Sequence, residues 1–173
     1  TRMETHCFFA EPDAQAAMSA VYLGCDNQHH DITTVVSHEY ADCKSRQLIR
    51  GVLDDKARGV FQGRVRVAPD AQKTDGQQMS RALLLSRDAE ADAKPELEIF
   101  ADDVVCSHGA TVGELDETLL FYLKSRGIDE AEARTMLIDA FLVDTLEEIS
   151  YQPFADFLRG QVSGWTARQT GNR

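Results

Sequence analysis

The sequence lacks an excess of positive charge and any long apolar run. Its 173 residues include 18 lysines and arginines against 29 aspartates and glutamates, a formal net charge of −11. Such a chain has no basic field to attract phosphates, so we expect neither nucleic acid nor an anionic membrane surface as a partner. No segment approaches the roughly 18 apolar residues of a membrane span, and the start, Thr1 to Glu4, has no signal-peptide pattern. We therefore expect a cytoplasmic chain with one core and an appendage.

Cysteine pairs and nucleotide-binding motifs are also missing. The four cysteines, Cys7, Cys25, Cys43 and Cys106, form no C-x-x-C pair, which disfavours a four-cysteine zinc site and predicts free thiols in a reducing compartment. No Gly-Lys dipeptide is present, so the chain has no Walker A loop and we expect no ATP site of its own. Neither G-x-S-x-G nor H-E-x-x-H occurs. The sequence therefore predicts no self-contained catalytic centre.

A period of two residues marks 32–100 as β structure. It is clearest where Phe61, Gly63, Val65 and Val67 alternate with Gln62, Arg64 and Arg66. Similar short segments centre near Val35, Arg50, Gly63, Leu84 and Leu97. Turn-rich pieces separate them, as at 53–59 and 68–70. Strands this short and evenly spaced fit a sandwich, a barrel or a solenoid, and the pattern alone does not choose among them.

After Gly113 the period changes to that of helices. The apolar spacing predicts a helix over 114–126 that Gly127 ends, and a second that begins at the capping residue Asp129 and runs to about Ile149. Beyond these we expect an interruption at Pro153, one more short helix over 154–165, and a frayed tail over 170–173. The appendage is therefore predicted to be helical.

The segment 94–113 carries the chemistry of most interest. If it is extended, Cys106 and His108 lie at i and i+2 and point to the same face of a strand. A thiolate beside an imidazole suits iron, zinc or persulfide chemistry, but two ligands do not close a metal site. The alternative is a buried thiol next to a histidine that hydrogen-bonds to a carbonyl, and the residues alone favour it.

Two further groups of polar residues deserve comparison. Asp102 and Asp103 are adjacent, so on a strand they would face opposite ways, and a turn role is the better interpretation. A second set of possible metal ligands comprises His29, His30, Asp31, His38 and Cys43. Its spacing matches no closed zinc arrangement, so stacking or turn roles are favoured there.

Several segments together are similar to one known family. They are Lys94–Ile99, Ala101–Val104, Cys106–Gly113, Leu115–Asp116, Leu120–Leu123 and Ser125–Ile128, with further matches at 28–31, 51–53, 59–61, 70–75 and 83–86. These residues resemble the C-terminal part of the SufB/SufD family of iron-sulfur cluster assembly proteins. The resemblance covers about residues 20–149.

The resemblance implies a fold mainly of β structure with a C-terminal α-helical domain. Residues 1–113 would form the later coils of a right-handed parallel β-helix whose N-terminal part lies outside this chain, and 114–173 a small helical domain. It further implies a scaffold subunit, not an enzyme, that pairs with SufB and whose helical domain binds the ATPase SufC. His108 would contribute to cluster formation at the SufB junction, with Cys106 a weaker candidate. The cluster would be held only transiently, shared with SufB, and ATP would act only through SufC.

Two other interpretations stay open. The chain could be purely architectural, with His108 a packed or interface histidine. A β-helix carbohydrate-active enzyme is also compatible with the fold, but it should show carboxylates and basic residues converging in a groove, which the sequence does not reveal. Since an exposed β-helix edge that normally meets a paralogue could meet its own copy, a homodimer is expected when SufB is absent.

Overall fold

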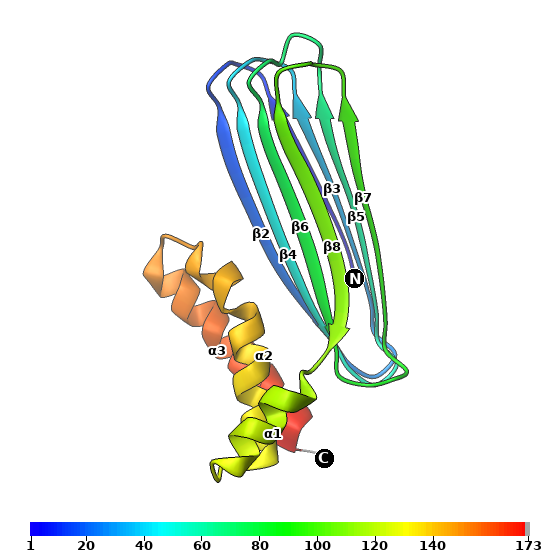
Figure 1. Ribbon diagram of the computed structural model, residues 1–173, viewed down its shortest axis with the longest axis vertical. Coiled ribbons are helices and arrows are strands. Elements are labelled where there is room, and N and C mark those ends of the chain that lie inside the picture. The colour runs from blue at the N-terminus through cyan, green and yellow to red at the C-terminus, as the bar shows by residue number, and fades with distance from the viewer. Residues whose placement is uncertain (172–173) are drawn as a thin grey trace.

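A computed structural model describes residues 1–171 as eight β-strands followed by three α-helices (Figure 1). The strands are β1 (Arg2–Phe9), β2 (Gln15–Gly24), β3 (His29–His38), β4 (Lys44–Leu53), β5 (Arg58–Val67), β6 (Asp75–Leu84), β7 (Glu90–Ile99) and β8 (Val105–Glu114). The helices are α1 (Glu117–Ser125), α2 (Glu130–Glu147) and α3 (Gln152–Gly171). None of these three helices is long and apolar enough to cross a membrane.

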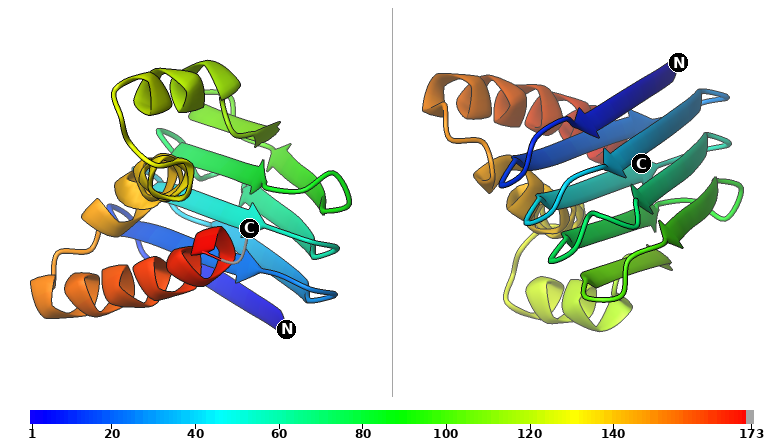
Figure 2. Two further views of the ribbon diagram at one scale, coloured as in Figure 1. Left: turned by 90° about the horizontal axis from the view of Figure 1, so that it is seen from below. Right: turned by 90° about the horizontal axis from the view of Figure 1, so that it is seen from above.

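The strands form a parallel β-helix. Odd-numbered strands make one sheet in the order β1-β3-β5-β7, and even-numbered strands make the other in the order β2-β4-β6-β8. Each strand pairs in parallel with the strand two further along the chain, so every two strands complete one coil and the four coils stack (Figure 2). The prediction of a mainly β solenoid followed by helices is therefore confirmed, and a sandwich or barrel is excluded.

Alternation along each strand decides what faces the interior. In β5, Phe61, Gly63, Val65 and Val67 are buried, while Gln62 and Arg64 are exposed, as the sequence predicted. In-register pairing then stacks the apolar side chains of successive coils on one another, as when Val36 pairs with Val65 and Val65 with Leu97. The core is thus a set of columns that run from coil to coil.

Turns at both ends of the coils use residues that tolerate the left-handed backbone. Positive φ values occur at Asp13, Asp26, Asp42, Asp55 and Lys73, four of them aspartates. Asp adopts this conformation more readily than most residues because its short side chain can hydrogen-bond locally. Backbone bonds also join successive turns, since Asp42 N donates to Gln72 O at 2.9 Å.

Three strands lie outside the segment that the period of two marked, although the family resemblance placed residues 1–113 in the β-helix. β1 and β2 precede the expected β region, because inward positions of β2 such as Ala16, Met18 and Ala20 are small or flexible and give little β-branched signal. β8, whose extended form was only a condition of the site hypothesis, occupies Val105–Glu114. The first expected helix therefore starts later than 114, at Glu117, where the Asp116 carboxylate accepts from Thr118 N at 2.8 Å and Leu119 N at 3.1 Å.

The remaining helices follow their predicted signals, with one correction. Gly127 has φ +87° just after α1, and the Asp129 carboxylate caps α2 by accepting from Ala131 N at 3.0 Å. The third helix is not short: α3 extends over 20 residues, because Pro153 lies in its first turn, where the missing N–H costs nothing. Of the expected frayed tail, 172–173 lie outside the described residues.

The helices cover the outer face of the β2-β4-β6-β8 sheet near one end (Figure 1). Val52 and Leu83 point outward from this sheet into a buried cluster with residues of α2 and α3, namely Ile138, Leu142, Leu146, Val162 and Trp165. Arg50 adds polar attachments, donating to Phe141 O at 2.9 Å and to the Asp144 carboxylate at 2.8 Å.

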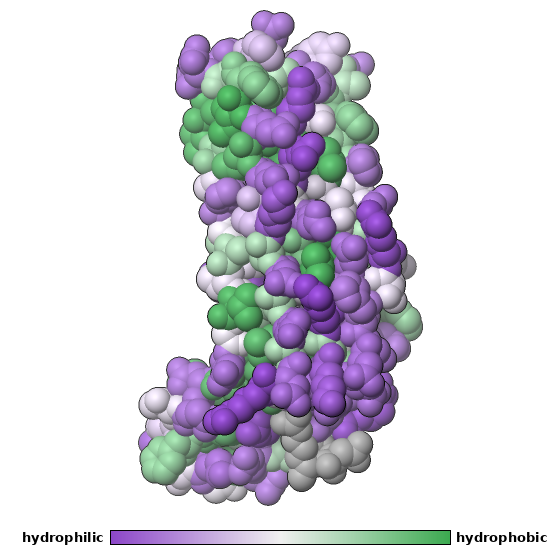
Figure 3. Space-filling model, turned by 90° about the vertical axis from the view of Figure 1, so that its right-hand side faces the viewer, coloured by the Kyte–Doolittle hydropathy of each residue, from purple (hydrophilic) through white to green (hydrophobic). Residues whose placement is uncertain are grey.

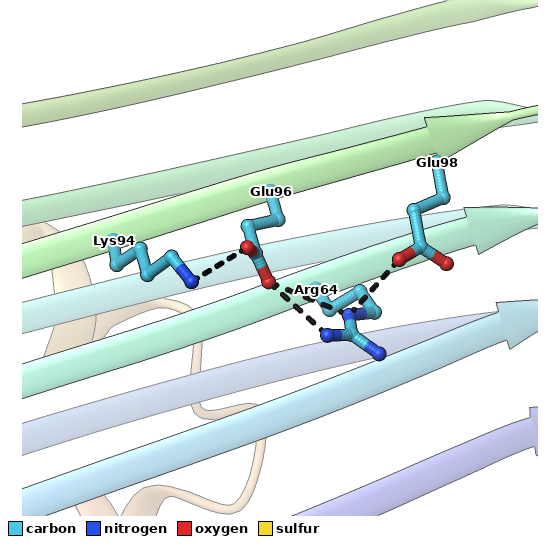
Figure 4. A network of polar contacts seen from close by, with 4 residues as sticks. All are labelled: Arg64, Lys94, Glu96 and Glu98. Carbon is cyan, nitrogen blue, oxygen red and sulfur yellow. Dashed lines mark hydrogen bonds and ion pairs between the residues drawn. The ribbon is translucent and has the colours of Figure 1, made fainter.

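The face of the molecule on the side of the other sheet is largely hydrophilic, with some apolar areas (Figure 3). Arg64 on β5 contacts both Glu96 and Glu98 on β7 at 3.4 Å, and Lys94 contacts Glu96 at 2.9 Å (Figure 4). The hydrogen bond from Lys94 helps to lower the pKa of Glu96. Exposed pairs of this kind stabilise by about 0–1 kcal/mol each, but charged side chains on an edge strand also disfavour aggregation.

Gly51→Ala is expected to destabilise the β-helix. A Cβ at Gly51 would lie 2.1 Å from Tyr22 Cζ, and Tyr22 is itself buried in the core. Overpacking of this kind costs about 1–3 kcal/mol, which urea denaturation monitored by circular dichroism would measure. Gly113→Ala is the matched control, because a Cβ there meets no atom within 4 Å. Equal midpoints for the two variants would contradict this account of the core.

Candidate site at the open end of the beta-helix

β8 forms one edge of its sheet in the last coil, and it carries the residues of interest. Cys106 is in register with Gly76 of β6, and His108 is in register with Gln78. Cys106 packs against the interior cluster that contains Val65 and Leu97, so its side chain points into the solenoid. His108 is two residues along the strand and faces the same way, as the spacing predicted. It is exposed because no further coil of the described chain lies over β8.

The two side chains differ in their surroundings. Gly76 gives the thiol room, since a Cβ at that position would lie 3.3 Å from Cys106 Sγ. Cys106 is half-buried, and this burial raises the pKa of its thiol and disfavours the thiolate that binds metals. His108 is an exposed imidazole on the same face. His108 is therefore the more available donor of the pair.

The site offers few ligands from this chain alone. Among residues 1–171 no three side chains of His, Cys, Asp or Glu come together as a group that could hold a metal ion. Exposed apolar side chains lie near the start of the same strand, at Ile99 on the end of β7, at Phe100 just after it and at Val105 on β8. The last coil thus combines two potential ligands with an unusually apolar rim.

The second set of possible ligands is dispersed. His38 is fully buried, its Nε2 lies 2.8 Å from Ser45 Oγ, and its ring packs on Phe9 with 4.6 Å between ring centroids. The buried Cys43 thiol donates to Glu11 O at 3.3 Å. These residues fill the core and its turns, which is the interpretation that their spacing favoured.

Asp102 and Asp103 lie in the bend between β7 and β8. The Asp103 carboxylate pairs with Lys73 Nζ, its carbonyl accepts from Lys73 N at 2.6 Å, and its own N–H donates to Gln72 Oε1 at 3.0 Å. The turn role that adjacency suggested for these aspartates is confirmed for Asp103.

A groove that sequence reasoning missed lies between the outer face of β4 and β6 and helix α2. It has a volume of about 550 Å³, and its charged lining residues are Arg46, Arg50, Arg81, Asp144, Glu147 and Glu148. Carboxylates and basic residues do converge there, contrary to expectation, but they neutralise one another: Arg50 pairs with Asp144 at 2.8 Å and Arg46 with Glu148 at 3.1 Å. The only local signal was Arg46 and Arg50 at an even spacing, which places them on one face of β4. These pairs attach α2 to the sheet.

Comparison with known proteins gives the family. Residues 1–141 match the family model described as SUF system FeS cluster assembly, SufBD core domain. The chain is 48% identical to the iron-sulfur cluster assembly protein SufD of Escherichia coli over 132 residues, which are 76% of this chain and 31% of that protein. It is 37% identical to SufD of Bacillus subtilis over 129 residues, 75% of this chain and 30% of that protein. To protein ABCI7, chloroplastic, of Arabidopsis thaliana it is 35% identical over 164 residues, 94% of this chain and 34% of that protein.

A parallel β-helix with these matches defines a class of assembly protein. The chain belongs to the SufB/SufD family of iron-sulfur cluster assembly proteins. It spans about a third of the length of the curated relatives that it matches.

The buried His38 is expected to make stability depend on pH. Burial lowers the pKa of His38 from 6.5 to about 4, so below pH 6.5 the unfolded chain binds a proton that the folded chain does not. Stability should therefore fall by about 3 kcal/mol as the pH drops from about 6.5 to 4, if this group acts alone. In urea denaturation across that range, His38→Gln should show a flatter dependence than the wild type. His6→Gln, at an exposed position, should keep the wild-type slope, and an unchanged slope in His38→Gln would refute the assignment.

Proposed function

We propose that this chain is part of a scaffold subunit, not an enzyme, for iron-sulfur cluster assembly in the SUF system. In this proposal the last coil of the β-helix pairs with SufB, and the helical part, residues 114–173, binds the ATPase SufC. His108 contributes a ligand to the cluster that forms at the SufB junction, and Cys106 is the weaker contributor. The cluster is the cargo, held only in passing, and ATP acts through SufC alone.

The observation that carries the proposal is the position of His108. An exposed imidazole stands beside a thiol in an uncovered edge coil, in a chain that belongs to a cluster assembly family. Imidazole and thiolate are both ligands of iron, and a site with two ligands needs more from elsewhere. A partner that covered β7 and β8 would bring such ligands while burying the apolar rim at Ile99, Phe100 and Val105.

The helices supply a second surface that supports partner binding. Large apolar side chains are exposed along them, including Phe121 at 74%, Phe157 at 59% and Phe154 at 50% relative exposure. Aromatic residues are enriched at protein interfaces and costly to leave in water over a wide area. Phe121 lies on α1, whereas Phe154 and Phe157 lie on α3, and all three are on different elements from the last coil. One subunit could therefore hold a partner on the helices and another on the last coil at once.

A second candidate function is purely architectural. The apolar rim at Ile99, Phe100 and Val105 would serve pairing whether or not His108 touches a cluster. The two functions differ in one respect only, which is whether loss of the imidazole matters while the complex remains intact.

His108→Ala is expected to abolish most of the iron and sulfide that copurify anaerobically with the complex of this protein, SufB and SufC. Size-exclusion chromatography of the same sample should show an intact complex, because His108 is exposed and its loss leaves no large cavity in the core. Cys106→Ser should cause a smaller loss. His29→Ala is the matched control, an exposed histidine on β3 away from the last coil, and should retain iron and sulfide. Retention in His108→Ala as well would establish the architectural function.

The isolated chain is expected to form a homodimer. The four strands β1, β2, β7 and β8 are the edges of the two sheets, so each carries backbone groups able to pair with another copy. Repulsion from a net charge of −11 opposes this, and added salt should therefore strengthen the dimer. Light scattering at tens of micromolar, on the order where weak pairing is detectable, would measure the mass. A monomer at both low and high salt would count against pairing through these edges.

A further inference from the structure

A column of polar side chains lies inside the β-helix directly behind His108. Gln47 of β4 is in register with Gln78 of β6, and Gln78 is in register with His108 of β8. Neighbouring strands in a sheet are about 4.8 Å apart, a spacing at which stacked amides form hydrogen-bonded ladders. Met18 of β2 is in register with Gln47 and closes the far end of the column with an apolar side chain.

The facing sheet is shaped to admit this column. Thr34 of β3 donates through Oγ1 to Gln47 Oε1 at 2.6 Å. In the next coil the residue in register with Thr34 is Gly63, and a Cβ at Gly63 would lie only 2.3 Å from Gln78 Nε2. The absence of a side chain at Gly63 therefore leaves the space that the Gln78 amide occupies. In the last coil the corresponding residue is Pro95.

Gln78 is buried without a partner for its amide. It is 2% exposed, and neither its Nε2 nor its Oε1 has a hydrogen-bond partner among the described residues. Leaving a buried polar group unpaired costs about 1–3 kcal/mol, so such an amide is retained where something pairs with it. Its register neighbours on either side are Gln47, whose Nε2 is also unpaired, and the ring of His108.

We propose that Gln78 is a positioning residue for His108, an inference that rests on the function proposed above. The ring nitrogen that faces the interior carries the proton and donates it to Gln78 Oε1. Gln78 Nε2 in turn donates to Gln47 Oε1, which accepts from Thr34 and has a second lone pair. The ring is then held in one tautomer, with the lone pair of its other nitrogen pointing out of the solenoid toward the cluster.

This arrangement is the one that metal-binding histidines generally need. A ligating imidazole commonly donates its second ring N–H to an acceptor, which fixes the ring orientation and the tautomer. An exposed histidine on an edge strand has little else to orient it. The amide of the preceding coil supplies the acceptor from a rigid, buried strand.

The inference is tested by the tautomer of His108 in the 173-residue chain without partners. Long-range proton–nitrogen correlation spectra of the ¹⁵N-histidine-labelled chain distinguish the two neutral tautomers, and His108→Ala assigns the signals. We expect one dominant tautomer in the wild type and a minor tautomer whose population rises several-fold in Gln78→Leu. Gln77→Leu is the matched control, because Gln77 is exposed on the opposite face of the same strand. It should leave the ring unchanged.

Gln78→Glu decides the direction of the bond, because a carboxylate only accepts hydrogen bonds. At a pH where the ring is neutral and the introduced carboxyl group is ionised, Gln78→Glu should keep the wild-type tautomer. A switch to the other tautomer would show that Gln78 donates in the wild type, which leaves the outward nitrogen protonated and overturns the proposal. An unchanged tautomer in Gln78→Leu would overturn it too, whether or not the Glu variant folds.

Failure here is distinguishable from failure of the proposed function. The tautomer is measured without SufB or a cluster, whereas the role of His108 is decided by iron and sulfide in the complex. If both hold, Gln78→Leu should lower the iron and sulfide content of an intact complex several-fold, and Gln77→Leu should not. If Gln78→Leu raised the minor tautomer of His108 but kept normal iron and sulfide, the orientation of the ring would not matter for cluster assembly. That result would overturn the inference and leave the proposed function intact.

Discussion

In-register parallel stacking is the constraint on which the rest of this structure depends. Each strand lies against the strand one coil away with no slip over eight to ten residues, as from Lys44 paired with Asp75 to Leu53 paired with Leu84. Because side chains alternate with a period of two, a slip of one residue would turn the whole interior outward. Register therefore fixes the apolar core, the inward amides and the position of His108 together. A change that disturbs one column is transmitted along the coils, since a packed interior has few voids to absorb it.

Helices cover the outer face of one sheet and ion pairs cover the outer face of the other, but neither covers the open end of the last coil. Val52 and Leu83 make one outer face apolar, which α2 and α3 cover. The other outer face carries ion pairs such as Arg64 with Glu96 and needs no cover. Within the described residues, neither the helices nor these ion pairs cover the interior at β7 and β8. Leu97, Cys106 and His108 therefore lie at its open end. Both the apolar rim and the potential ligand His108 are exposed because the stack of coils ends at β7 and β8 within the described residues.

Local sequence patterns predicted where strands and helices occur better than they predicted how these elements are arranged in space. Alternation at Phe61 to Val67 and the capping residue Asp129 are encoded within a few neighbours, and both predictions are confirmed. The period of two did not mark β2, because small inward residues such as Ala16 and Ala20 weaken it, and only the family resemblance included this part of the chain in the β-helix. The choice of a solenoid over a sandwich depends on pairing between residues about a coil apart, as His29 pairs with Arg58, and no local period reveals it. Likewise the spacing of Cys106 and His108 predicts a shared face, but only the register shows Gln78 behind the imidazole.

If His108 is the ligand that we propose, the same geometry suits a histidine better than a cysteine at this position. Burial disfavours charged forms, and it already raises the pKa of the half-buried Cys106 thiol, whereas a neutral imidazole can ligate without becoming charged. A partner that covered the last coil would remove more water and so disfavour the thiolate further relative to the neutral imidazole, as long as no metal ion is bound. A bound metal ion reverses this effect of burial, because its positive charge stabilises the thiolate. A histidine would therefore be ready to bind first, and a thiol beside it would become a ligand only once iron is present.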